Sequence, residues 1–279
     1  MTTTFDHAED ILKYCAGQAD VALVILRNVT GGTLRSRGAM MAVTPTSSAG
    51  YISNGCVDAD IIARARSGQS GTFIYGVGSP YRDIQLPCGG SLEITIFQTP
   101  DRKALEAART LLSARKATEL NLGEVTIPLS PRLRIRVAGK GAACAALAEL
   151  ARLTGLDVHI QSPDINEFPH AQHLTDPKSP PSNLDDARTA MVCLFHDHDW
   201  EPQLLGQALN GPAFYVGAMG SQRTHDTRCK ALREIGLTQS QISRMNGPIG
   251  LIPAQRNSNF LAISIMAEII QTAQIKKLI

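Results

Sequence analysis

The sequence predicts two α/β domains, a mixed α/β N-terminal domain followed by a C-terminal domain with a parallel sheet covered by helices. At 279 residues the chain is longer than one ordinary hydrophobic core requires. Closely spaced prolines in the segment 128–131 block the continuation of a helix or a central strand. Beyond that segment, short apolar runs alternate with helical patterns, which is typical of parallel β-α-β units. The predicted domains therefore span residues 1–127 and 132–279.

The elements of the N-terminal domain are predicted from apolar runs, helical periodicity and turn residues. A continuous apolar run over residues 21–26 is typical of a strand buried on both faces. Val57, Ile61 and Ala65 share one face of a helical pattern, and Asp101 is typical of a helix N-cap. We expect helices over residues 5–19, 56–66 and 102–119, a turn over 47–50, and strands over 21–26, 37–43, 72–75 and 92–97.

The C-terminal domain is predicted from alternating strands and helices. Its first unit is a strand over 133–138, a glycine turn and a helix over 142–154. Between residues 162 and 188 lies a segment with five prolines and no clear period, so we expect a binding loop or a mobile connection there. We expect further strands over 157–161, 189–195 and 213–217, with a helix between the last two.

Composition and motif content exclude several classes of protein. The 27 Lys and Arg residues against 25 Asp and Glu residues give a net charge of +2, which argues against a nucleic-acid-binding surface. The N-terminus has no basic segment followed by an apolar one, so we expect a cytoplasmic protein. The most apolar stretch, 260–270, is shorter than the roughly 20 residues of a membrane span. The sequence also lacks the G-x-S-x-G, Walker A and H-E-x-x-H motifs.

A glycine turn, Gly139-Lys140-Gly141, matches the first two glycines of a dinucleotide-binding fingerprint. Backbone N–H groups at such a turn can approach a phosphate at the N-terminus of the following helix. Cys144 occupies the third position in place of Gly or Ala, and Ser162 stands near the strand end where an acidic residue is usual. A nucleotide site and a ligand-free tight turn both remain open.

A second candidate anion site follows the strand over 213–217. Ser221 is placed to cap a helix, and Arg223 follows in its first turn. An ordinary capped helix is the alternative interpretation.

Two cysteines of the N-terminal domain lie among glycines. Cys56 follows Gly55 at a predicted helix N-terminus, where the helix dipole stabilises a thiolate. Cys88 precedes Gly89 and Gly90, which permit close approach of another molecule to the backbone. We favour a shared site over two separately buried thiols. The cluster His196-Asp197-His198-Asp199 contains good metal ligands, but it can equally be a polar loop whose Asp199 caps the helix that begins near Trp200, so no metal ligand is assigned.

Several blocks of the chain, in order, resemble the XdhC/CoxI family of molybdoenzyme accessory proteins. The resemblance implies a Rossmann-like C-terminal domain and a chaperone without turnover of its own, which binds the molybdenum cofactor in its molybdopterin form. It also implies that the chaperone protects the cofactor while its terminal sulfur ligand is installed and promotes its insertion into a xanthine dehydrogenase-type apoenzyme. The blocks that carry it are 38–44, 53–58, 87–90, 215–223, 236–238, 248–251 and 262–269.

The resemblance implies partners and site residues. The partners are the xanthine dehydrogenase-type apoenzyme and a cysteine desulfurase-type sulfur donor, with a homodimer as a further option. The residues expected to contact the cofactor are Gly55, Cys56, Cys88, Gly89, Gly90, Gly139, Gly141, Ser221 and Arg223.

Two other hypotheses remain. One is an NADP-dependent oxidoreductase that uses the Gly139-Lys140-Gly141 turn, because Ser162 would not repel a ribose phosphate as an Asp would. The other is an interaction module that docks its partners through the segment 162–188 and the C-terminal helix.

Overall fold

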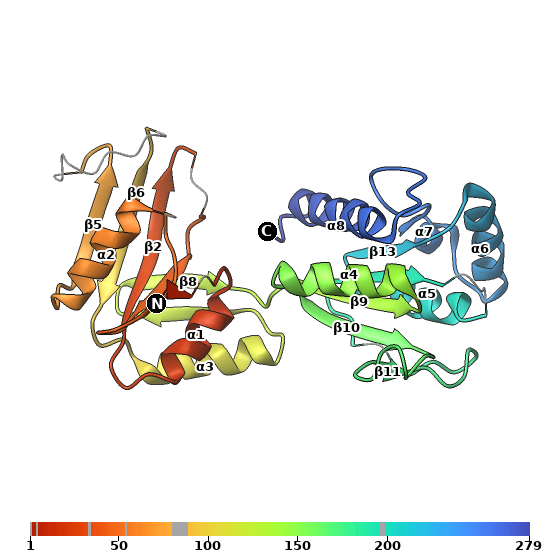
Figure 1. The fold of residues 1–279 in the computed structure, drawn as a ribbon, viewed down its shortest axis with the longest axis horizontal. Helices are drawn as coiled ribbons and strands as arrows, with labels where there is room; N and C mark the ends of the chain where they lie inside the picture. The colour runs from red at the N-terminus through yellow and green to blue at the C-terminus, as the bar shows by residue number, and fades with distance from the viewer. Residues whose placement is uncertain are drawn as a thin grey trace. The chain divides into compact units, whose positions relative to one another are not determined.

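The computed structural model divides the chain into two compact units, Met1–Pro131 (unit 1) and Arg132–Ile279 (unit 2). It describes residues 2–3, 5–32, 35–53, 55–79, 89–182, 184–195 and 199–279, without the side chains of Thr2, Thr3 and Cys56. Each unit has its own main sheet (Figure 1). Hydrophobic cores lie on both faces of each of these sheets.

Unit 1 is built on a mostly antiparallel six-stranded sheet in the order β1-β4-β3-β2-β6-β5. The long strand β2 pairs antiparallel with both β3 and β6, and only β1 and β4 pair in parallel. The strands are β1 (Thr2–Thr3), β2 (Ala22–Thr30), β3 (Met40–Val43), β4 (Ser48–Gly50), β5 (Gly71–Gly76) and β6 (Ser91–Phe97).

Both faces of this sheet are covered, which explains why the first half of β2 is apolar at every position. Leu23 and Ile25 pack in a core with α1 (Ala8–Ala16), α3 (Arg102–Ser113) and the hairpin of β7 (Thr118–Leu122) and β8 (Val125–Leu129). Val24 and Leu26 pack on the opposite face against α2 (Cys56–Arg66).

Three local predictions for unit 1 were wrong. The helix expected to reach residue 119 ends at Ser113, because Arg115 adopts a left-handed conformation with φ of 58° and the chain then turns into β7. Residues 48–50 form β4 rather than a turn. Pro128 lies within β8 rather than in a linker, since a two-stranded ribbon has free edges that tolerate a residue without an N–H.

Unit 2 contains a six-stranded parallel sheet in the order β11-β10-β9-β12-β13-β14, with the first strand, β9, in the middle. This is the strand order of doubly wound nucleotide-binding folds, with the reversal between β9 and β12. The strands are β9 (Arg134–Gly139), β10 (Asp157–Ser162), β11 (Gln172–His173), β12 (Thr189–Leu194), β13 (Tyr215–Ala218) and β14 (Met245–Asn246).

Helices cover both faces of this parallel sheet. α4 (Ala142–Leu153) and α8 (Ser258–Ile275) pack on the core around Ile135 and Val137. α5 (Glu201–Asn210), α6 (Gln222–Glu234) and α7 (Gln239–Ile242) pack on the opposite core around Met191 and Cys193. The predicted fold class, a mixed α/β domain followed by a Rossmann-like parallel-sheet domain, is confirmed.

The proline-rich segment after β10 is anchored rather than free, which corrects the expectation of a mobile connection. Leu174 is buried in the core beside α5. Asp185 accepts hydrogen bonds from Arg136 of β9 at 2.8 and 2.6 Å, and both side chains are at most 1% exposed. The segment thus covers a sheet face that a crossover helix often covers, using a buried ion pair in place of an apolar stripe.

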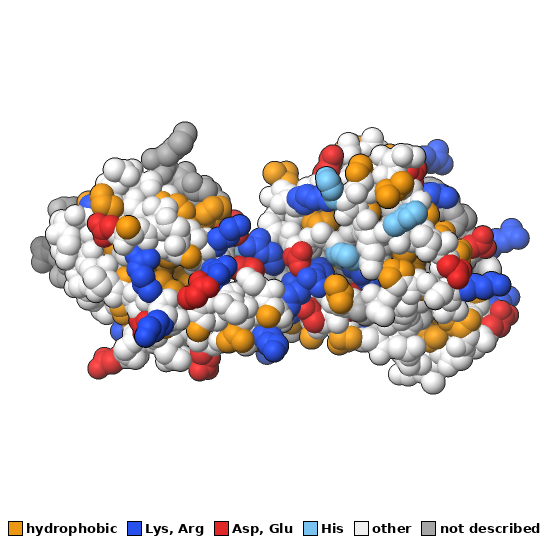
Figure 2. All heavy atoms as spheres, turned by 90° about the horizontal axis from the view of Figure 1, so that it is seen from below, with side chains coloured by type: hydrophobic (Ala, Val, Ile, Leu, Met, Phe, Trp, Pro, Cys, Tyr) orange, Lys and Arg blue, Asp and Glu red, His pale blue; other side chains and the backbone are white. Residues whose placement is uncertain are grey.

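Basic and acidic side chains are interspersed on the face drawn in Figure 2. No helix within the described ranges is long and apolar enough to span a membrane.

Candidate functional site

The carboxyl ends of the parallel strands in unit 2 bring two of the predicted sites to the same edge of the sheet. The Gly139–Gly141 turn follows β9, and Ser221 follows β13. Leu194, at the end of β12, is in register with Gly139. Ligands of doubly wound sheets bind at this edge, next to the reversal in strand order.

Gly139 is required by the close approach of β12. A Cβ atom at this position would lie 2.7 Å from the carbonyl oxygen of Leu194, which is closer than packed atoms tolerate. Gly141 adopts φ of 80° and forms the N-cap of α4 without a side chain. Its N–H is not free, because it donates a hydrogen bond to Oε2 of Glu167 at 2.8 Å. No local pattern in the sequence predicts this contact, because Glu167 lies 26 positions further along the chain.

Cys144 is a packing residue in this structure. It is fully buried in the core between α4 and the sheet, and burial raises the pKa of its thiol to about 12. The third position of the glycine fingerprint is thus filled by a small buried side chain.

The second turn presents a helix N-terminus with a free cation. The hydroxyl of Ser221 accepts a hydrogen bond from the N–H of Thr224 at 3.1 Å, so Ser221 is the N-cap of α6. Arg223 is exposed, and its guanidinium has no hydrogen bond or ion pair within the described residues. A monoanionic or dianionic group could bind there to backbone N–H groups and to Arg223 together.

A buried ion pair between α5 and α6 holds the backbone of this second turn in place. Arg228 of α6 donates to both carboxylate oxygens of Glu201 in α5, at 3.0 and 2.6 Å, and to the carbonyl oxygen of Met219 at 2.8 Å. Both charged side chains are at most 2% exposed. The position of Met219, two residues before Ser221, is therefore fixed by the contact between α5 and α6. No local pattern in the sequence predicts the pairing of Arg228 with Glu201, which lies 27 positions earlier in the chain.

In unit 1, Asp58 organises the loop before α2. Its carboxylate accepts hydrogen bonds from the N–H groups of Ile52 and Ser53, both at 2.9 Å, and from that of Gly55 at 3.0 Å. Cys56 is the first residue of α2, as its sequence position predicts, and its side chain is outside the described part of the chain.

The glycines after Cys88 lie where β6 begins. Gly89 adopts φ of 66°, and a Cβ atom at Gly90 would collide with the carbonyl oxygen of Thr30 in β2. Glycine at position 90 is thus explained by strand packing, without a ligand. Cys88 itself lies outside the described residues, as does the predicted polar loop 196–198.

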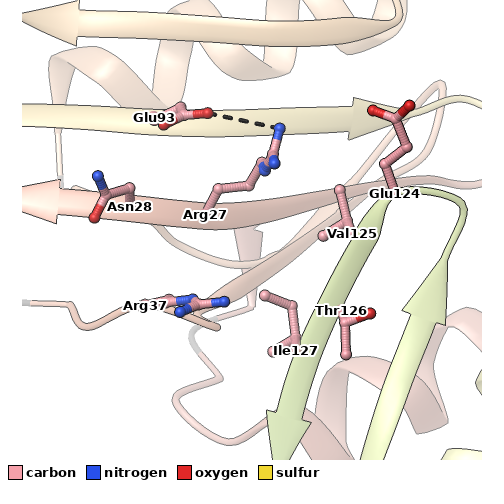
Figure 3. Close-up of a pocket in the computed structure, with 8 residues that line it drawn as sticks. All are labelled: Arg27, Asn28, Arg37, Glu93, Glu124, Val125, Thr126 and Ile127. Atoms are coloured by element: carbon pink, nitrogen blue, oxygen red, sulfur yellow. Dashed lines mark ion pairs between the residues drawn. The ribbon is translucent and has the colours of Figure 1, made fainter.

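A polar hollow of about 190 Å³ opens in unit 1, where the β7–β8 hairpin meets the sheet (Figure 3). Arg27 and Glu93 face each other across neighbouring strands, 3.6 Å apart, and Glu124 stands at the hairpin turn. None of the predicted site residues lines this hollow. Across the described ranges, no three His, Cys, Asp or Glu side chains converge as a metal site would require.

Comparisons with known proteins identify relatives over most of the chain. Residues 135–269 match the XdhC Rossmann domain, and residues 15–76 match the XdhC and CoxI family. The molybdenum cofactor insertion chaperone PaoD of Escherichia coli (strain K12) is 31% identical, over 88% of this chain and 81% of that protein. The uncharacterized protein YqeB of the same organism is 26% identical over 50% of this chain but only 27% of its own length.

A solved structure supports the fold over both units. The crystal structure of a xanthine dehydrogenase from Bacillus halodurans matches with a TM-score of 0.76 and covers 96% of each chain, at 19% identity. Together with the family matches, these relatives confirm the resemblance found in the sequence, and the chain belongs to the XdhC and CoxI family.

Proposed function

We propose that this chain is a molybdenum cofactor insertion chaperone. In this role it carries the cofactor as cargo, protects it while its terminal sulfur is installed, and delivers it to a xanthine dehydrogenase-type apoenzyme. The observation that carries the proposal is the 31% identity to PaoD over 88% of the chain. A cysteine desulfurase-type protein would supply the sulfur.

The phosphate of a molybdopterin would bind at the N-terminus of α6. Of the two candidate turns in unit 2, the Gly139–Gly141 turn already holds a carboxylate, whereas Arg223 beside Ser221 has no partner in the described part of unit 2. An anionic ligand therefore gains a charge-assisted contact at α6 without displacing another group. Gly139 and Gly141 would then shape the neighbouring edge of the sheet rather than bind the phosphate.

The thiols of Cys56 and Cys88 are proposed as soft contacts to the sulfur-ligated metal of the cargo. The support is chemical, since thiolates suit soft metal centres, and Cys56 begins α2, where the helix dipole favours the thiolate. Gly55 and Gly89, where no atom of the described residues lies within 4 Å of an added Cβ atom, would give the cargo access to the backbone, whereas Gly90 is explained by strand packing.

Retention of cofactor by the purified chain tests the proposal. The chain is mixed with molybdopterin released from a donor protein and washed by ultrafiltration, and the retained pterin is oxidised and measured by fluorescence. Retention near one pterin per chain is expected. A folded sample that retains none would refute the chaperone function.

Variants separate the roles of the two regions. Arg223→Gln should weaken retention by roughly 10- to 150-fold, since a charge-assisted hydrogen bond contributes about 1.5–3 kcal/mol. Lys230→Gln, which removes an exposed charge from the same helix, is the matched control. Cys56→Ala and Cys88→Ala should each weaken retention, whereas Cys229→Ala should not. Normal retention by both unit 1 variants would make Cys56 and Cys88 packing residues.

Two observations bear on the remaining hypotheses. The carboxylate of Glu167 at the Gly141 N–H counts against an NADP-dependent oxidoreductase that uses this turn. Docking of partners by the segment 162–188 is better tested by substitutions at its exposed residues than by deletion, because deletion would leave the buried Arg136 without Asp185.

A further inference from the structure

The connection between β10 and β11 folds back onto the N-terminus of α4. There the N–H of Gly141 donates to Oε2 of Glu167 at 2.8 Å. In dinucleotide-binding turns, the N–H groups at this helix N-terminus hold the diphosphate. The chain thus places its own carboxylate where a diphosphate oxygen would otherwise bind.

Glu167 is held at this position by the residues around it. Oδ1 of Asp164 accepts hydrogen bonds from the N–H groups of Asn166 and Glu167, both at 3.0 Å. The hydroxyl of Ser162 in turn accepts from the N–H of Asp164 at 3.1 Å. On the other side, the ring of Phe168 is 9% exposed and packs in the core with α4. The backbone at Glu167 is therefore fixed on both sides, and its side chain needs little further ordering to reach Gly141.

The carboxylate and a diphosphate compete in two ways. They require the same N–H donor, and they carry charge of the same sign within a few ångströms of each other. The negative charge of Glu167 also reaches the first turn of α4, where it adds to burial in raising the pKa of the Cys144 thiol. A ligand with two phosphates would have to displace the Glu167 side chain from the Gly141 N–H, and the negative charge of the displaced carboxylate would still repel it.

We propose that Glu167 determines the specificity of the Gly139–Gly141 turn by occupying the phosphate position, so that this turn excludes the diphosphate of NADPH and NADH. This role is independent of cofactor retention and goes beyond the chaperone function. It also explains how a chain can keep the glycine turn of a dinucleotide-binding fold without binding the dinucleotide.

The test is titration of the full chain with NADPH and NADH, followed by nucleotide fluorescence and calorimetry. Glu167→Gln keeps the shape and an acceptor oxygen but removes the charge. Glu149→Gln is the matched control, because Glu149 lines the same cavity of about 250 Å³ as Glu167 and makes no contact with Gly141. Glu167→Ala removes the acceptor altogether, and circular dichroism checks the fold of each variant.

The wild-type chain and Glu149→Gln should show no saturable binding of NADPH or NADH over the range titrated. Glu167→Gln and Glu167→Ala should bind NADPH with a Kd at least roughly tenfold below the highest concentration used. Wild-type binding of NADPH as tight as that of Glu167→Gln would overturn the proposal. So would two folded variants that bind no better than wild type. Weaker binding in the variants would instead make Glu167 an acceptor for ribose hydroxyls, which contradicts exclusion.

Discussion

Removal of the charge of Asp185 should destabilise unit 2 more than almost any other single polar substitution. Arg136 lies in the central strand β9, and its guanidinium donates to both oxygens of Asp185 at 2.8 and 2.6 Å. The two side chains are 1% and 0% exposed. In Asp185→Asn the Arg136 charge stays buried without a counter-charge, which costs about 3–5 kcal/mol.

This free energy predicts a large change in melting temperature. For a domain of about 150 residues each kcal/mol corresponds to about 2–4 °C, so Asp185→Asn should lower the Tm by about 6–20 °C. Circular dichroism measures the transition, and limited proteolysis should show cleavage within the segment 174–188, which the ion pair anchors. Asp176→Asn, at an exposed position in the same segment, should change the Tm little.

A double substitution distinguishes an unpaired charge from lost packing. Arg136→Met with Asp185→Leu removes both charges together, and replacement of a buried ion pair by apolar residues is often neutral. The double variant should therefore be more stable than Asp185→Asn. If Asp185→Asn and the Asp176→Asn control have the same Tm, the ion pair does not anchor the segment and the reasoning is refuted.

Three further predictions concern packing, thiol chemistry and pH. Gly139→Ala should destabilise by about 1–3 kcal/mol in urea denaturation, because its Cβ would lie 2.7 Å from a carbonyl oxygen of β12; equal midpoints for this variant and Gly32→Ala, where nothing lies within 4 Å, would contradict the packing argument. Cys144, whose pKa burial raises to about 12, should react with iodoacetamide at least roughly tenfold more slowly than the half-buried Cys229, and equal labelling in mass spectra would show that α4 opens readily. Burial lowers the pKa of His225, so the unfolded chain takes up its proton first and the free energy of unfolding should fall as the pH drops through about 6.5. His225→Gln should flatten that part of the pH profile, and an unchanged slope would assign the acid sensitivity to other groups.

Elements with strong local signals were predictable from sequence. The bounds of α2 match the helical pattern that begins at Cys56, and the strand, glycine turn and helix around Gly141 lie within one residue of expectation. Apolar periodicity and glycine placement act over a few residues, so they are visible in the sequence. The β7–β8 hairpin was missed because Pro128 argues locally against a strand, although a free ribbon edge tolerates it.

The polar contacts that shape the candidate site were not predictable in the same way. Arg136 alternates with apolar residues along β9 and reads as a solvent-facing side chain, yet it pairs with a residue 49 positions further along the chain. Glu167 meets Gly141 only because its connection folds back by 26 positions. Both contacts depend on the path that a long connection takes back to the sheet, and no local sequence pattern encodes that path. The pairing of Glu201 with Arg228 was not predictable for the same reason.

The two outer strands of the parallel sheet, β11 and β14, are only two residues long. An exposed strand of ordinary length presents a row of backbone donors and acceptors that another extended chain can join. With two residues each, β11 and β14 themselves offer almost no such row. A chaperone that meets incompletely assembled enzymes would benefit from such short outer strands, since an extended segment of a client finds few backbone groups on β11 and β14 to pair with. Unit 2 would then recognise a client through side chains and loops rather than through backbone strand pairing, and such contacts would let the client dissociate again.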